Sequence, residues 1–262
     1  DKQGVNIDRA EYDGIFNGNS TNGFFNLHQK HILAENFLIK NSLSFNRHTN
    51  NWQLGILDFK QTDDVLKFRS DVELQLTNNI KLISGFEAED RFREYKGVIP
   101  EEDFDYRPEG FGEVIDVEVD NYRLGGYGEF EIKNLFGIEN LFTVSGVRFD
   151  AFPDIDINWF DPRVGIGFKL SDISTIKLAA GIFHQLPDLR LFSSDDGNPK
   201  LQSMKAEHIV LSYDLTLNKN NSIRIEGYHK NYEDLPLEDD ILNYTNDGEG
   251  FANGVDVILK GK

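Results

Sequence analysis

The chain contains a repeated pattern in which apolar and polar residues alternate one by one. It is clearest in Lys205–Tyr232, where Ile209, Leu211 and Leu215 share one parity and the tight reversal Lys219–Asn221 separates two arms. Because successive side chains of a strand point to opposite faces, this stretch predicts an antiparallel hairpin with one apolar and one polar face. Each arm has about ten residues, which is the length that a tilted strand needs to cross a bilayer.

Similar alternation along most of the chain predicts eleven or twelve strands. Those that we identify are Phe24–Leu33, Phe37–Asn46, Leu66–Leu76, Ile80–Phe92, Tyr122–Lys133, Leu141–Phe149, Arg163–Leu170, Thr175–Phe183, the two arms of the hairpin above, and Phe251–Leu259. We therefore predict an irregular lead-in at residues 1–21 and a partial antiparallel transmembrane β-barrel at residues 22–262. Bacterial single-chain barrels close with an even number of strands, so an odd count indicates a piece of a larger barrel.

The predicted connections alternate between short and long. Short reversals fall near residues 34, 78, 136, 172 and 219, and long polar connections cover residues 47–65, 93–120, 151–162, 184–205 and 233–249. Every second connection of an antiparallel sheet lies at the same end, so one end carries the long loops, many of them acidic. This is typical of an outer-membrane barrel with short periplasmic turns, whereas a sandwich or propeller does not sort its loops in this way. If Trp52–Lys60 were a separate spanning strand, this alternation of short and long connections would be broken. We therefore predict that it is part of an outer loop or a strand extension.

Composition excludes several classes of function. The formal net charge of −18 argues against a nucleic-acid partner, which requires a basic surface, and the absence of Cys excludes disulfides and thiolate metal sites. The sequence contains no run of eighteen apolar residues, so it predicts no transmembrane helix. A barrel with a polar lumen needs no such helix. The chain opens at Asp1 without a signal peptide, which indicates processing or truncation rather than a cytosolic address.

Several stretches resemble the barrel region of TonB-dependent outer-membrane receptors. They are Gly146–Asp150 (GVRFD), Asp161–Gly167 (DPRVGIG), Gly181–Pro187 (GIFHQLP), Asn198–Leu201 (NPKL), Ala206–His208 (AEH), Arg224–Leu235 (RIEGYHKNYEDL) and Asn246–Gly254 (NDGEGFANG). Their order and spacing are similar to those of the family over Tyr122–Lys262. Residues 1–121 resemble the family only in their general pattern, without matching motifs.

The resemblance implies a barrel of twenty-two strands that encloses an N-terminal plug. It implies active uptake of a nutrient across the outer membrane of a Gram-negative bacterium, with no enzymatic activity. The partners implied are outer-membrane lipid, the plug and the remaining strands, which this sequence lacks, a TonB-type energy transducer acting through the plug, and in some cases a surface lipoprotein. The ligand stays open among iron chelates, corrinoids, glycans and peptides. A passive porin-like channel and a soluble all-β binding or adhesion module are the alternatives.

Charged residues on the polar faces of the strands are the candidates for contact with a plug or a transported solute. The residues singled out are Arg69, Glu87, Arg91, Arg123, Glu129, Arg163, Arg224 and Glu226. The competing interpretation is a hydrated wall of cross-strand ion pairs, each contributing under about 1 kcal/mol, and for any single residue we favour it.

No catalytic, cofactor-binding or metal-binding residue is predicted. His28 and His31 have an odd separation, which places them on opposite faces of a strand. The acidic groups Asp195–Asp196 and Glu238–Asp240 resemble calcium ligands but lack EF-hand spacing, so solvated loops are the preferred interpretation.

Overall fold

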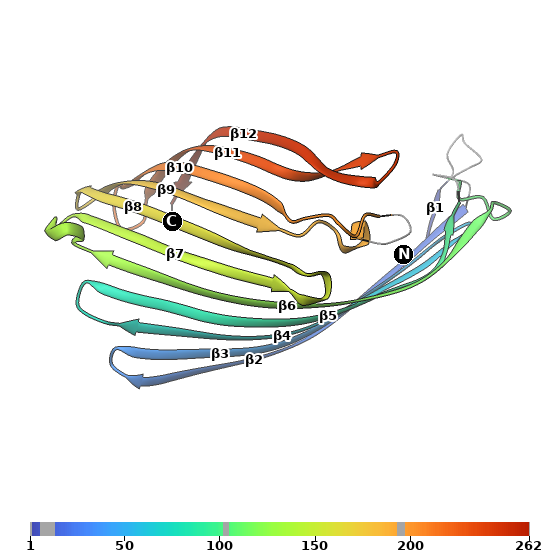
Figure 1. The fold of residues 1–262 in the computed structure, drawn as a ribbon, viewed down its shortest axis with the longest axis horizontal. Helices are drawn as coiled ribbons and strands as arrows, with labels where there is room; N and C mark the ends of the chain where they lie inside the picture. Colours follow the sequence, from blue (N-terminus) through green and yellow to red (C-terminus); the bar gives the residue numbers. More distant parts are fainter. Residues whose placement is uncertain (1, 6–13, 102–104, 193–196, 262) are drawn as a thin grey trace. The chain divides into compact units, whose positions relative to one another are not determined.

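The computed structural model describes residues 2–5, 14–101, 105–192 and 197–261, and most of them lie in β-strands. Twelve strands form one sheet in which each strand is hydrogen-bonded to the next in chain order, from β1 to β12 (Figure 1). This confirms the predicted all-β architecture and the count of eleven or twelve strands. Within the described part of the chain, no helix has the length and apolar composition needed to span a membrane.

The strands differ in length and are joined as hairpins. Their bounds are β1 (Lys2–Val5), β2 (Gly14–Ala34), β3 (Phe37–Leu54), β4 (Leu57–Gln75), β5 (Ile80–Pro100), β6 (Gly112–Lys133), β7 (Leu141–Phe152), β8 (Ile157–Ser171), β9 (Ser174–Gln185), β10 (Met204–Thr216), β11 (Ser222–Asp239) and β12 (Asn243–Lys260). In the described part of the chain, the short 3₁₀ helices η2 (Leu135–Gly137), η3 (Pro153–Ile155) and η4 (Leu189–Phe192) lie in connections between strands.

Contacts divide the chain into two compact units, which we describe separately. Unit 1 consists of Asp1–Gln29, Asn41–Arg69 and Glu87–Arg123. Unit 2 consists of Lys30–Lys40, Ser70–Phe86 and Leu124–Lys262.

The register in unit 2 sorts apolar and polar residues into separate rows. Leu211 of β10 lies opposite Leu178 of β9, and Tyr213 lies opposite Ile225 of β11. Directly after Tyr213 in sequence, on the other face, Asp214 lies opposite Arg224 of β11. Because the period of a strand is two residues, the alternation within each strand becomes a whole apolar face and a whole polar face.

The apolar face is open rather than covered by another layer of protein. Leu211 is 51% exposed and Val257 is 62% exposed. The buried apolar side chains of the described residues are Tyr95, Phe152, Ile157, Trp159 and Leu201. A soluble sandwich buries its apolar faces in a dry core, so a wide exposed apolar face instead indicates contact with lipid.

The predicted lead-in is wrong in its described part. Lys2–Val5 forms β1 and pairs antiparallel with residues 14–17 of β2, which begins at Gly14 rather than near Phe24. The polar residues of this segment show no alternation, and backbone pairing makes the strand instead. The division into a lead-in and a barrel domain itself stays a prediction.

The strands also extend far into the connections that were predicted to be long. β5 continues to Pro100 and β6 starts at Gly112, so the predicted irregular stretch Arg93–Asp120 is mostly strand. Strand likewise replaces most of the loops predicted at residues 151–162 and 233–249. The strand extension at Trp52–Lys60 is confirmed, since β3 and β4 meet at Gly55-Ile56. Beyond a lipid layer both faces of a strand meet water, so apolar alternation is no longer required there.

The short turns and one long connection are confirmed. β8 and β9 are separated by Asp172-Ile173, and β10 and β11 by residues 217–221. β9 ends at Gln185 and β10 begins only at Met204, so this connection is long, as predicted.

Candidate functional site

In unit 1, charged side chains from three adjacent strands form a cluster around two carboxylates. Glu87 of β5 is 5% exposed. Its carboxylate lies 2.9 Å from Lys67 Nζ on β4 and 3.4 Å from Arg123 on β6. Arg69 lies 3.6 Å from the same carboxylate. Burial of a carboxylate is unfavourable unless cations and donors compensate it, and this cluster supplies them.

Glu89 extends this cluster along β5. Its carboxylate lies 3.2 Å from Arg91, 3.7 Å from Lys67 and 4.0 Å from Arg123. Four predicted candidates, Arg69, Glu87, Arg91 and Arg123, are therefore brought together. Because the two carboxylates share their cations, the network holds these charged side chains in place on the surface of the sheet.

In unit 2 the other four candidates lie in two separate groups. Arg163 of β8 lies 3.8 Å from Glu129 of β6. Arg224 of β11 donates a hydrogen bond of 2.5 Å to Asp214 and lies 3.7 Å from Glu226. All eight candidates thus have charged neighbours in the structure. Contact with a solute or a plug remains a prediction for each of them.

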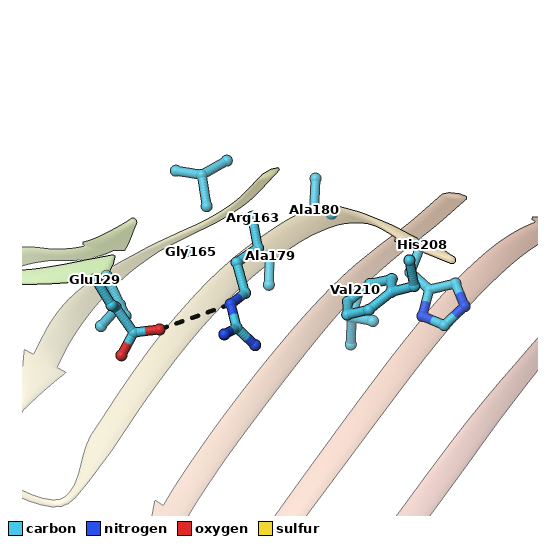
Figure 2. A pocket seen from close by; sticks show the side chains of 11 residues that line it. Glu129, Arg163, Gly165, Ala179, Ala180, His208 and Val210 are labelled. Carbon is cyan, nitrogen blue, oxygen red and sulfur yellow. Dashed lines mark ion pairs between the residues drawn. The ribbon is translucent and has the colours of Figure 1, made fainter. Parts of the chain in front are cut away.

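A hollow lies beside the Glu129–Arg163 pair on the polar face of β8, β9 and β10, with a volume of about 290 Å³ (Figure 2). Figure 2 shows Arg163, Ala179, Val210 and His208 on one side of these strands and Ala180 on the other. The hollow exists because small residues meet there. Register places Ala179 opposite Gly165 on one side and Val210 on the other.

An aromatic pair forms one end of this hollow. The rings of Phe183 and His208 have centroids 4.7 Å apart and planes tilted by 34°. A Cβ atom at Gly181 would lie 3.1 Å from the ring of Phe183 and 3.2 Å from Arg163 Cβ, so glycine allows both side chains to approach the backbone. The sequence offered the small residues Gly165, Ala179 and Gly181, but not their alignment.

A second group of residues missed at the sequence level lies near the ends of β7, β8 and β9. Asp150 is 2% exposed and accepts two hydrogen bonds from Arg148, of 2.6 and 2.8 Å. Asp161 hydrogen-bonds His184 Nδ1 at 2.6 Å, and the His184 ring stacks on Trp159 at 5.7 Å. Trp159 also packs with Phe152 and Ile157, and Leu186 and Phe192 cover that cluster. These contacts anchor the start of the long β9–β10 connection.

The connections at the long-loop end are tied to one another by asparagine side chains. Asn198 Nδ2 donates to the Tyr244 carbonyl at 2.7 Å, and Asn243 Nδ2 donates to the Gly197 carbonyl at 3.1 Å. Asn246 accepts a hydrogen bond of 2.8 Å from the Gln202 amide. The β9–β10 connection is therefore fixed to the β11–β12 hairpin.

The tip of the β11–β12 hairpin is capped by one carboxylate. Asp239 accepts hydrogen bonds from the amides of Ile241 and Leu242, at 2.9 and 2.8 Å. These two bonds hold the pKa of the Asp239 carboxyl below its ordinary value, because they stabilise the charged form. The acidic group Glu238–Asp240 contains this cap.

Among the described residues, no group of three or more His, Cys, Asp or Glu side chains is placed to hold a metal ion. His28 and His31 both lie in β2 with the odd separation predicted to place them on opposite faces. The acidic pair Asp195–Asp196 lies outside the described residues.

The apolar face of unit 2 has a polar border at the long-loop end. On β10 the outward positions change from Ile209 to Glu207, and Lys205 beyond it lies 2.8 Å from Glu207 and 3.1 Å from Glu233 of β11. On β11, the His229 ring forms a hydrogen bond with the side chain of Asn253 on β12. From Ile209 to Leu217, just after β10 ends, the outward positions are apolar over a length of about 25 Å along the strand. With the usual tilt of barrel strands this length covers about 20 Å of the roughly 25 Å lipid-facing band of outer-membrane barrels.

Comparison with known proteins agrees with a sheet that has one apolar and one polar face. The family model described as TonB dependent receptor-like, beta-barrel, matches residues 2–262. The chain belongs to this family. Its members are receptors and transporters of the Gram-negative outer membrane rather than enzymes, so the resemblance and localisation predicted from the sequence are confirmed. No curated protein sequence matches the chain.

Solved structures of receptors from this family share the fold. The ferric-catecholate import receptor Fiu of Escherichia coli K12, in its closed form, has a TM-score of 0.76 at 13% identity, over 95% of this chain and 45% of that chain. The FrpB iron transporter of Neisseria meningitidis has a TM-score of 0.71 at 9% identity, over 98% of this chain and 44% of that chain.

The siderophore receptor PirA of Pseudomonas aeruginosa has a TM-score of 0.69 at 11% identity, over 94% of this chain and 48% of that chain. The chain therefore spans less than half of the length of each of these three structures. At such identities the likeness concerns the fold alone.

Proposed function

We propose that this chain is part of the barrel wall of an active outer-membrane transporter that takes up a scarce nutrient. Energy is supplied by a TonB-type transducer acting through a plug enclosed by the barrel. The observation that carries the proposal is the family match over residues 2–262. No covalent chemistry is required of the wall, which encloses the route and positions the groups that contact solute or plug.

The two faces of the sheet support this role. Exposed apolar residues such as Leu211 and Val257 suit acyl chains. The opposite face of the same strands carries the group around Asp214, and in unit 1 an ion-paired cluster surrounds Glu87. Charges spread along a wall in this way keep it hydrated, which a route for a polar solute requires.

The solved relatives make an iron chelate the first ligand to test. Fiu is described as a ferric-catecholate import receptor, PirA as a siderophore receptor and FrpB as an iron transporter. Since identities of 9–13% support the fold alone, corrinoids, glycans and peptides stay in the test.

The test is uptake by cells that carry or lack the intact protein. Four probes are used: radiolabelled ferric citrate, cyanocobalamin, a maltooligosaccharide and a mixture of short peptides. Each is measured with and without a protonophore that dissipates the inner-membrane potential. We expect one probe to accumulate only in cells that carry the protein, and only while the potential is intact.

A passive porin-like channel predicts a different result. Uptake would continue after the protonophore is added and would stop when internal and external concentrations are equal. That outcome would contradict active transport and leave the β-barrel wall intact. If the protein fractionates with soluble proteins without detergent, the membrane role itself is wrong.

A further inference from the structure

The hollow beside Arg163 combines a shape and a chemistry that the proposed transport function does not specify. It is lined by small and apolar groups at its centre, including Gly165, Ala179 and Val210. A volume of about 290 Å³ lies near the lower limit for small-molecule pockets, so it suits one compact group rather than a large ligand.

Its aromatic end favours a flat group. Phe183 and His208 lie 4.7 Å apart at the rim, and the ring of Phe183 is folded over Gly181. Aromatic rings prefer offset-stacked or edge contacts with other rings at centroid distances of about 4.5–7 Å. Gly165 and Ala179 carry little or no side chain, so a third ring could rest on them beside the rings of Phe183 and His208.

The charge at the rim favours an anion. Arg163 lies 3.8 Å from Glu129, which is longer than a hydrogen bond, and a guanidinium has five N–H donors. It can therefore donate to a second carboxylate with bidentate geometry while it stays near Glu129. Register places Lys230 of β11 across from His208, but its ammonium lies over the ring of Tyr228, 5.0 Å from the centroid, so Arg163 is the cation among the residues that line the hollow. Glu129 is the acidic residue among those that line the hollow.

We propose that this hollow is a subsite for an aryl group that carries a carboxylate, supplied by a free solute that enters the lumen. The ring lies on Gly165 and Ala179 against Phe183 and His208, and the carboxylate accepts hydrogen bonds from Arg163. The inference rests on the proposed function only in requiring that the polar face line a water-filled route. It adds the chemical class of part of the solute.

The test uses thiol protection in the intact protein in outer-membrane vesicles. Residues 1–262 contain no Cys, so Ala179→Cys gives this part of the protein a single thiol, in the floor of the hollow. Labelling by N-ethylmaleimide is timed with and without benzoate, and the unsubstituted protein serves as the blank. Benzoate at ten times its Kd leaves about one site in eleven free, so labelling slows about tenfold.

Arg163→Gln in the Ala179→Cys background tests the role of charge. We expect the concentration of benzoate that protects the thiol to rise about tenfold, because a charged pair is lost. Benzyl alcohol, which has the ring without the carboxylate, should protect both variants equally and weakly. Asp256→Cys, on the same face of β12 but three strands away, is the matched control, and its labelling should not respond to benzoate.

Three results would overturn the subsite. The thiol introduced by Ala179→Cys could be unreactive without benzoate, which would show that polypeptide already fills the hollow. It could label at the same rate with and without benzoate, or Arg163→Gln could leave protection unchanged. Leu211→Cys tests the proposed membrane barrel separately. A thiol that faces lipid stays unlabelled whether or not the subsite exists, so rapid labelling of this thiol would contradict the barrel and not the subsite.

Discussion

At the scale of single residues, glycines on the polar face make room for the rings of neighbouring strands. A Cβ atom at Gly85 would lie 2.4 Å from the ring of Tyr127, and one at Gly167 would lie 2.2 Å from the ring of Phe142. The Tyr127 hydroxyl also donates a hydrogen bond of 2.6 Å to Asp71. A ring that covers a glycine restores packing where the strand has no side chain.

Gly85→Ala should therefore destabilise the protein by about 1–3 kcal/mol, because the added methyl group displaces Tyr127 and stretches its bond to Asp71. Gly227→Ala is the matched control, since no atom lies within 4 Å of the position of its Cβ. The measurement is the urea midpoint of the intact protein in vesicles. Equal midpoints for the two variants would contradict the packing role of Gly85.

Asp239 gives a prediction for pH. Its pKa is lowered in the folded tip, so its stabilising hydrogen bonds are present above the ordinary Asp value of about 3.9 and are lost as pH falls through the lower folded value. We expect the amides of Ile241 and Leu242 to stay protected down to about pH 4. In Asp239→Ala they should exchange at the rate of unprotected amides at every pH tested. Hydrogen exchange of the tip measures both, and equal protection in the two proteins would refute the cap.

At the scale of elements, the cluster on β4, β5 and β6 is held by carboxylates shared among several cations. Glu87 is nearly buried, and Lys67, Arg69 and Arg123 all lie within 4 Å of it. The side chain of Glu118, on β6, is 58% exposed and lies 3.9 Å from Lys96 on β5. Solvent screens the second pair but not the first, so the two acids should differ in their contribution to stability.

Glu87→Gln should lower the free energy of unfolding by about 1–3 kcal/mol, because three cations lose the charge that compensates them. Glu118→Gln should change it by about 0–1 kcal/mol. Urea unfolding of the intact protein in vesicles compares them. A Glu87→Gln effect no larger than that of Glu118→Gln would show that the cluster is an ordinary solvated surface.

At the scale of the whole molecule, twelve strands in chain order carry one face for lipid and one for water. In unit 2 the apolar face is exposed rather than covered by a second layer of protein, and this distinguishes it from the sheets of a soluble sandwich. The membrane supplies the missing apolar contact. A charge in the middle of the apolar face should therefore be much less tolerated than one at its border.

Leu211→Arg should destabilise the folded protein in bilayers by about 2–4 kcal/mol, and Glu207→Arg, at the border of the same strand, by about 0–1 kcal/mol. The measurement is again urea unfolding in vesicles, followed by the heat-dependent shift in electrophoretic mobility. Similar costs at both positions would mean that Leu211 does not face the hydrocarbon layer.

Much of the fold could be predicted because each spanning strand carries its own two-residue period. Ile209, Leu211 and Leu215 show which face of β10 is apolar without reference to any neighbour. The strand ends were harder to predict. Val117 and Val119 alternate with acids in β6, but the charge of Arg93–Asp120 led to the prediction of an irregular connection.

Sequence alone thus determined the all-β class, the two faces, the short turns and the family, since these follow from local periodicity and short motifs. Only the tertiary structure decided how far β5, β6, β11 and β12 extend, because pairing with a neighbouring backbone holds those segments. It also decided which charges meet at Glu87 and that a hollow opens over Ala179. The physical reason is register: residues distant in sequence become neighbours only once the hydrogen bonds between strands align them.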